Sequence, residues 1–141
     1  MTEYTKDTIE QLIPQRHPIV MIDGVSILNA SSAIATLNVE ADNWFFCDGA
    51  LLEAGLVEHA AQSAAALLGA RDYSAGKPAQ IGYIGEVKNF EVNKLPESGE
   101  RIVTRIQLLA EVDAVSLVEV RSEVNGEYVC AGQIKVVIVG E

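Results

Sequence analysis

Basic residues and long apolar runs are the features that this 141-residue chain has least of. Lys and Arg number 10 against 20 Asp and Glu, so the formal net charge is -10. A surface with this charge repels phosphate backbones and anionic lipids, which excludes nucleic acid and a membrane surface as partners. The N-terminal sequence MTEYTKDTIEQL also lacks the cationic and apolar regions of a signal peptide. We therefore expect a cytoplasmic protein.

Cysteine and proline are also scarce. The chain has two cysteines, Cys47 and Cys130, and four prolines. Two thiols cannot hold a disulfide framework, and neither has a Cys or His neighbour at metal-ligand spacing. We expect both cysteines to be reduced, buried and inert, and we expect no metal site. The length and the apolar fraction of 49% predict a single domain over residues 1–141.

One long helix is predicted over residues 50–70. The sequence ALLEAGLVEHAAQSAAALLGA is rich in Ala and Leu, and Gly69 is the expected C-cap. Apolar side chains lie on nearly every face, which indicates a helix buried in a protein core or in a membrane. Glu53, Glu58 and Gln62 keep its apolar runs well short of the roughly 18 residues of a membrane span. The helix is therefore expected to lie in a protein core.

The rest of the chain is predicted to be mainly β-strand. A short helix over 5–13, ending at Pro14, is expected to precede two strands joined by a tight turn. A polar loop over 71–78 follows the long helix, and Asn125-Gly126 is typical of a two-residue hairpin turn within an antiparallel meander. A sheet that curls around one buried helix is an α+β architecture. The expected strands cover 25–28, 33–39, 79–92, 101–110, 115–124 and 128–139.

Three segments resemble the 3-hydroxyacyl-acyl-carrier-protein dehydratases. LIPQRHPIVMID at 12–23 is similar to the opening motif of that family, and EHAAQ at 58–62 is similar to its Glu-Ala-Met-Ala-Gln. IGYI at 81–84, followed by VKNF at 87–90, resembles the strand that runs along the acyl tunnel. The resemblance implies a hotdog fold, in which a curved antiparallel sheet wraps one central helix. It also implies a dimer whose sheets join edge to edge, with active sites at the subunit interface.

The resemblance further implies a set of site residues. Dehydration needs a base for the C2 proton, an acid for the leaving 3-hydroxyl and donors for the thioester oxygen. Glu58 matches the acid, and Gln62, one turn further on, would orient it; the alternative for Glu58 is a structural carboxylate bonded to a neighbour. Gly49 and Gly55 match the helix N-terminus whose free N–H groups bind the oxygen. The expected tunnel residues are aromatic: Trp44, Phe45, Phe46, Tyr83 and Phe90. No cofactor is implied.

The base of the family is missing from its expected place. The family carries a histidine in a His-Phe-Pro-Gly motif before the helix, whereas residues 42–49 here read DNWFFCDG. His59 is adjacent to Glu58, and neighbouring helical side chains point about 100° apart, so the two cannot face one substrate from the same chain. His17 lies in a loop, and we interpret both histidines as structural more readily than catalytic. Cys47 and Asp48 are weaker substitutes near the helix start.

Three functions fit these observations. The first is a dehydratase-like protein of fatty-acid or polyene-type lipid biosynthesis that removes water from a 3-hydroxyacyl thioester. The second is a non-catalytic dehydratase-like subunit that binds acyl chains or pairs with an active dehydratase. The third is an acyl thioesterase, in which a helix carboxylate activates water.

The acyl group would be carried by acyl-carrier protein or by coenzyme A. Acyl-carrier protein is acidic, so docking it onto a chain of this charge requires a local concentration of basic residues. Six basic residues lie close together in the sequence, although such a cluster is equally typical of a solvated sheet rim. They are Arg71, Lys77, Lys88, Lys94, Arg101 and Arg105.

Overall fold

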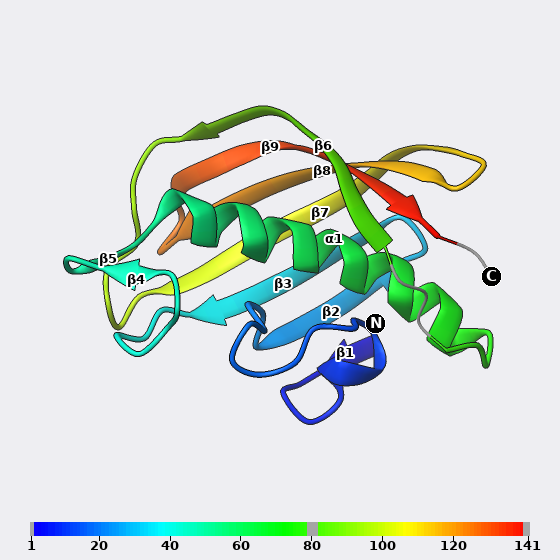
Figure 1. Ribbon diagram of the computed structural model, residues 1–141, viewed down its shortest axis with the longest axis horizontal. Coiled ribbons are helices and arrows are strands. Elements are labelled where there is room, and N and C mark those ends of the chain that lie inside the picture. The colour runs from blue at the N-terminus through cyan, green and yellow to red at the C-terminus, as the bar shows by residue number, and fades with distance from the viewer. Residues whose placement is uncertain (1, 79–81, 140–141) are drawn as a thin grey trace.

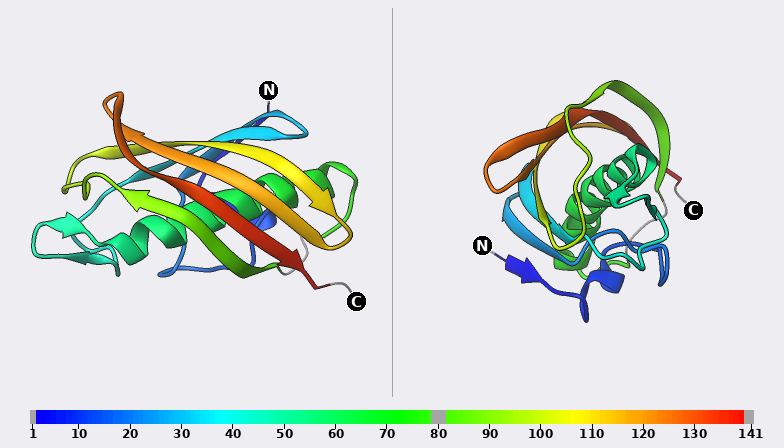
Figure 2. Two further views of the ribbon diagram at one scale, coloured as in Figure 1. Left: turned by 90° about the horizontal axis from the view of Figure 1, so that it is seen from above. Right: turned by 90° about the vertical axis from the view of Figure 1, so that its left-hand side faces the viewer.

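The computed structural model describes residues 2–78 and 82–139. A seven-stranded antiparallel sheet, in the order β1-β2-β3-β7-β8-β9-β6, wraps the single long helix α1 (Glu53–Ser74) (Figures 1 and 2). The hotdog architecture expected from the sequence is confirmed. The strands are β1 (Thr2–Tyr4), β2 (Gly24–Asn29), β3 (Ser32–Asn38), β6 (Gly82–Val92), β7 (Arg101–Val112), β8 (Val115–Val124) and β9 (Glu127–Ile138), while β4 (Phe46–Cys47) and β5 (Ala50–Leu51) form a separate hairpin.

The meander β7-β8-β9 forms as its turn residues predict. Asn125 and Gly126 both have positive φ angles, 52° and 80°, which is the requirement of a type I′ hairpin turn. Inward-facing residues alternate along β8, with every second side chain from Ser116 to Val124 buried. This alternation directs one face of the sheet onto α1.

Helix α1 is buried on most of its circumference, as the lack of a polar face predicts. It begins three residues later than expected because Ala50 and Leu51 pair with β4, and the Leu51 N–H donates to the carbonyl of Pro96 at 2.8 Å. Val57, Glu58 and Ala65 lie on a stripe of the helix that the chain's own sheet covers only in part. Among the described residues, no helix is long and apolar enough to cross a membrane.

The C-terminal cap of α1 differs from the prediction. Gly69 lies inside the helix, and the capping glycine is Gly76, with a φ of 75°. Lys77 N–H donates to the Asp72 carbonyl and Gly76 N–H to the Tyr73 carbonyl, which is the hydrogen-bond pattern of a Schellman motif. Gly69 has a packing role instead, because a Cβ there would overlap the backbone carbonyl of Leu12.

The N-terminal segment is also less helical than expected. The only helical element within 5–13 is the 3-10 turn η1 (Ile9–Gln11), preceded by β1, which pairs with β2. Thr8 Oγ1 accepts a hydrogen bond from the Thr5 N–H, and this local bond competes with a regular helix. The apolar residues Ile9, Leu12 and Ile13 still reach the core and are about 1% exposed.

Candidate functional site

Glu58 and Gln62 contact each other on α1. They are four residues apart and therefore lie on the same face of the helix. Nε2 of Gln62 donates a hydrogen bond of 2.8 Å to Oε2 of Glu58. Gln62 is fully buried, whereas Glu58 is half-buried and lies on the partly covered stripe of the helix.

The opening motif of the chain, residues 12–23, also forms hydrogen bonds with the side chain of Gln62. Oε1 of Gln62 accepts a hydrogen bond of 2.6 Å from the Met21 N–H, and its Nε2 donates one of 2.8 Å to the Ile19 carbonyl. Because the Met21 N–H can only donate, it fixes which end of the Gln62 amide faces Met21. The amide nitrogen is thereby directed to Glu58. Two of the three segments that carry the family resemblance, 12–23 and 58–62, therefore meet in space, although about 40 residues of sequence separate them.

His59 points away from Glu58 into the core. Its Nδ1 lies 2.7 Å from the Met21 carbonyl and its Nε2 lies 2.7 Å from Oγ1 of Thr104. Burial lowers the pKa of His59 to about 4, against smaller raising effects of the Met21 hydrogen bond and of Asp23. The ring is therefore neutral at physiological pH, and the described geometry gives it no path to a substrate beside Glu58.

His17 lies in the opening motif, before the residues Ile19 and Met21 that bind Gln62. It is exposed and lines a pocket of about 200 Å³ together with Lys6, Ile9 and Asp23, among others. Glu58 does not line this pocket. The structure thus brings Glu58 and Gln62 together but not Glu58 and either histidine.

The loop before the helix carries its aromatic residues in two different environments. Trp44 is 67% exposed, whereas Phe45 and Phe46 are half-buried and pack on the core cluster that includes Leu51 and Leu56. Oδ1 of Asn43 accepts the Phe45 N–H at 2.8 Å and fixes the turn. Among the predicted tunnel residues of this loop, only Phe45 and Phe46 are directed into the protein.

The two glycines assigned to the helix N-terminus lie in different places. Gly49, with a φ of 87°, is in the turn between β4 and β5 and not on the helix, so its assignment to the helix start is wrong. Gly55 is in the first turn of α1, where its N–H donates to the Leu52 carbonyl at 2.9 Å. A Cβ at Gly55 would lie 2.7 Å from Cβ of Phe45, so the close approach of the aromatic loop requires a glycine here.

The cysteines differ in exposure. Cys130 is buried as predicted, and burial raises the pKa of its thiol, partly offset by a hydrogen bond with Ser122. Cys47 is exposed, which corrects the expectation that it is a small buried residue. The short hairpin of β4 and β5 explains the difference, because only one residue of β4, Phe46, can face the core.

The aromatic residues expected on β6 include one that the structure describes in full. Phe90 is partly buried and packs on both core clusters, where its ring covers Gly132 of β9. Tyr83 lies in β6, but its side chain is outside the part of the chain that the structure describes, as are residues 79–81.

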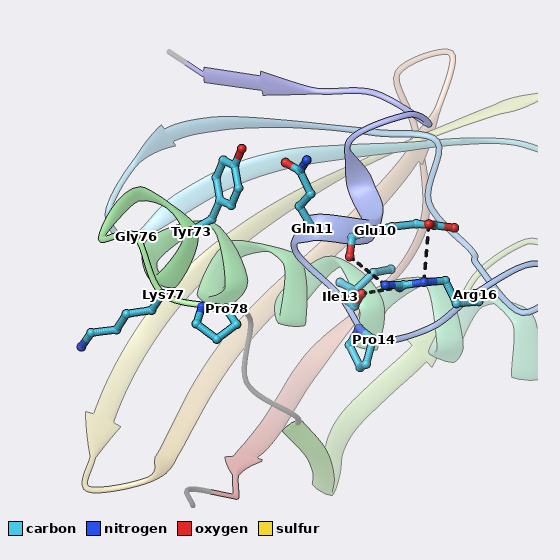
Figure 3. A pocket seen from close by; sticks show the side chains of 9 residues that line it. All are labelled: Glu10, Gln11, Ile13, Pro14, Arg16, Tyr73, Gly76, Lys77 and Pro78. Carbon is cyan, nitrogen blue, oxygen red and sulfur yellow. Dashed lines mark hydrogen bonds and ion pairs between the residues drawn. The ribbon is translucent and has the colours of Figure 1, made fainter.

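The largest of the four described pockets lies at the other end of α1 from Glu58. It has a volume of about 640 Å³ and lies between the N-terminal segment and the C-terminal end of α1 (Figure 3). Its Arg16 donates to the carbonyls of Ile13, Gln15 and Glu10, so the guanidinium is already engaged. None of the four pockets is lined by Glu58 or Gln62.

The fold separates the basic residues that are close in sequence. Arg71 is at the end of α1 and pairs with Glu111 at 2.9 Å. Lys88 is on β6, whereas Arg101 and Arg105 are on β7, and β8 and β9 lie between these strands. The expected local concentration of positive charge is therefore dispersed over the molecule.

Comparisons with known proteins identify the class. The model of the family described as "ApeP-like: ApeP dehydratase" matches residues 7–139. The 3-hydroxyacyl-[acyl-carrier-protein] dehydratase FabZ of Lactiplantibacillus plantarum is 28% identical over 136 residues, covering 92% of this chain and 90% of that protein. With the observed fold, these matches define a hotdog-fold protein similar to the 3-hydroxyacyl-acyl-carrier-protein dehydratases. The chain belongs to the ApeP-like dehydratase family.

Solved structures agree with the fold. The dehydratase heterocomplex ApeI:P from Xenorhabdus doucetiae contains a chain that superposes with a TM-score of 0.79 at 14% identity, covering 94% of this chain and 91% of that one. A hypothetical thioesterase with coenzyme A from Streptococcus pneumoniae superposes with a TM-score of 0.64 at 12% identity, covering 83% and 87%. At these identities the likeness concerns the fold alone.

Proposed function

We propose that this chain is a cytoplasmic dehydratase-like subunit that supplies Glu58, oriented by Gln62, to a 3-hydroxyacyl thioester site completed by a partner dehydratase. The observation that carries the proposal is the 2.8 Å hydrogen bond from Gln62 to Glu58. This bond supports the role of an acid for Glu58, in a chain whose loop 42–49 has no histidine to serve as the base.

In the dehydration reaction, Glu58 would be the acid that protonates the leaving 3-hydroxyl. A base removes the C2 proton, the C2–H electrons form the C2=C3 double bond, and the C3–O bond breaks as the hydroxyl takes a proton and leaves as water. Oε2 of Glu58 is engaged by Gln62, so Oε1 is the oxygen from which that proton would be passed. Regenerating the acid requires the proton taken from C2 to return to Glu58 through the base and solvent.

The base is proposed to come from the partner. Strand β6 is an edge strand of 11 residues whose Ile84 and Val87 are 44% and 38% exposed. The other edge of the sheet is the three-residue β1. A long edge with exposed apolar residues favours pairing with another chain. A heterodimer with a histidine-bearing relative fits best, and a homodimer is the alternative that experiment must distinguish.

The acyl group is proposed to arrive on acyl-carrier protein. The relatives that match over nearly the whole chain are named for acyl-carrier-protein substrates. Because the basic residues are dispersed, the negative charge of this chain disfavours direct docking of an acidic carrier. We propose that the carrier docks chiefly on the partner subunit and that coenzyme A thioesters serve as weaker substrates.

The test is purification of the intact complex from the native host, its mass, and its turnover. Hydration of a trans-2-enoyl thioester measures the reverse reaction, and release of free thiol measures thioesterase activity. We expect a heterodimer in which Glu58→Gln lowers hydration by at least about 10²-fold. The matched control Glu53→Gln, on an exposed residue of the first helical turn, should leave the rate unchanged. Thiol release that depends on Glu58, or full hydration by the isolated chain, would contradict the proposal.

A further inference from the structure

Two side chains of α1, those of His59 and Gln62, bind the backbone of the same residue of the opening motif, Met21. Gln62 accepts from the N–H of Met21 at 2.6 Å, while Nδ1 of His59 lies 2.7 Å from the carbonyl of Met21. Residues 59 and 62 are one helical turn apart and share a face of the helix. Met21 is 0% exposed, so neither of its backbone groups can take water as a substitute partner.

His59 is held in turn by the sheet. Its Nε2 lies 2.7 Å from Oγ1 of Thr104, which lies 2.6 Å from Oγ of Ser122, and all three side chains are at most 1% exposed. Thr104 of β7 and Ser122 of β8 are directly opposite each other in the sheet. Because the Met21 carbonyl can only accept, the Nδ1 nitrogen carries the ring hydrogen, and Nε2 accepts from the Thr104 hydroxyl.

These contacts form one chain of hydrogen bonds that leads from the half-buried Glu58 into the core. It runs through Gln62, the peptide groups of Met21, His59 and Thr104 to Ser122. Every member is satisfied by its neighbours, and a fully satisfied buried network rigidifies the groups that it joins.

We propose that His59 is a positioning residue: by holding the backbone of Met21 it keeps Gln62, and through Gln62 the carboxylate of Glu58, in the orientation that proton transfer requires. The inference rests on the proposed role of Glu58 and deepens it. His59 itself does not touch a substrate. Its contribution is to fix the carbonyl of Met21, the residue whose N–H decides which end of the Gln62 amide faces Glu58.

Two substitutions of His59 test the contacts of its two ring nitrogens separately. His59→Asn keeps an amide N–H near the position of Nδ1 and so a donor for Met21, whereas His59→Gln carries its amide outward towards Thr104 and leaves Met21 without its donor. Both place a neutral amide in the same buried site, so their general effects on stability are matched.

The first measurement uses the purified protein and no substrate. Hydrogen exchange of the Met21 backbone N–H and of the Gln62 side-chain amide is followed by NMR. We expect exchange in His59→Asn, which keeps the donor to Met21, to be at least about tenfold slower than in His59→Gln. Equal rates in the two variants would overturn the proposal.

If both variants fail to fold, Thr104→Val and Thr104→Ser take their place. Thr104→Val removes the hydroxyl donor from Nε2 at constant volume, and Thr104→Ser retains the donor. The proposal expects faster exchange at Gln62 in Thr104→Val alone. Equal exchange in this pair counts against it.

The second measurement is the hydration rate of the purified complex with a trans-2-enoyl thioester. Acting through Glu58, His59→Gln should lower kcat with little change in KM and should cause no further loss in a Glu58→Gln background. An additive loss overturns the positioning role. A complex whose activity is indifferent to Glu58→Gln overturns the proposed function instead, and the exchange measurement still decides whether His59 orders Gln62.

Discussion

The side-chain amide of Gln62 donates a hydrogen bond of 2.8 Å to Oε2 of Glu58 while the same nitrogen donates to the carbonyl of Ile19. Gln62 thus connects a half-buried carboxylate to the backbone of a segment distant in sequence. The orientation of Glu58 depends on the tertiary fold and not on the helix alone. Because of this dependence, removing the side chain of Gln62 and removing the charge of Glu58 should change the free energy of unfolding by very different amounts.

Gln62→Ala should be far more destabilising than Glu58→Gln. Removing the Gln62 amide leaves the N–H of the buried Met21 and the carbonyl of the half-buried Ile19 without these partners, which should lower the free energy of unfolding by about 3 kcal/mol. Glu58→Gln keeps the shape and an oxygen for Gln62 and should change that free energy by less than about 0.5 kcal/mol. Urea unfolding measures both, with the exposed Gln107→Ala as a neutral control. A large loss in Glu58→Gln would identify Glu58 as a structural carboxylate.

Acid should destabilise the protein through His59. Its pKa is about 4 in the folded protein and near the ordinary value of 6.5 in the unfolded chain. Above pH 6.5 the ring is neutral in both states, and below it the unfolded state binds the proton first. The free energy of unfolding should therefore fall as the pH falls from about 6.5 to about 4, by a total of about 3 kcal/mol.

The difference between wild type and His59→Asn isolates this contribution from the carboxylates. Urea unfolding at a series of pH values should give a steeper fall in stability for the wild type than for the variant. Parallel curves would show that the ring is charged or solvated in the folded protein.

Local patterns were sufficient to predict most of the fold. Continuous Ala and Leu over 50–70 predicted a buried helix, and Asn125-Gly126 predicted the hairpin between β8 and β9. Both signals depend on neighbouring residues only. The four-residue spacing of Glu58 and Gln62 likewise placed them on one helical face.

The partners of the site could not be predicted, because they come from distant segments. Gln62 binds Met21, 41 residues away, and His59 binds Thr104, 45 residues away. No local pattern predicts such contacts. The sequence also looks the same whether the imidazole of His59 is buried in the core or points into the site beside Glu58. The hairpin of β4 and β5 was also missed, since strands of two residues carry no periodicity.

Gly69 illustrates how a packing constraint can resemble a helix stop. A Cβ there would overlap the Leu12 carbonyl, so Gly69→Ala should lower the free energy of unfolding by about 2 kcal/mol despite the better helix propensity of alanine. Chemical denaturation monitored by circular dichroism gives the value. Ser74→Ala, on an exposed residue at the end of the same helix, is the control and should be nearly neutral. A stabilised Gly69→Ala would mean that the N-terminal segment moves away from the helix easily.

The last prediction concerns the loop over residues 42–49, where the dehydratases that this chain resembles carry a histidine and this chain does not. The isolated protein should show little dehydration of 3-hydroxyacyl-acyl-carrier-protein, because the lack of a general base typically costs about 10² to 10⁴ in rate. Trp44 precedes Phe45 as the family's histidine precedes its phenylalanine, and it is 67% exposed, so Trp44→His should change the free energy of unfolding by less than about 0.5 kcal/mol. Turnover of the isolated protein should rise by at least about tenfold in Trp44→His and not in the matched Trp44→Gln, and the gain should disappear when Glu58→Gln is added. Robust turnover by the isolated wild type in both directions, abolished by Glu58→Ala, would instead require a base within this chain, with His17 and the His59 of a second copy as the first to test.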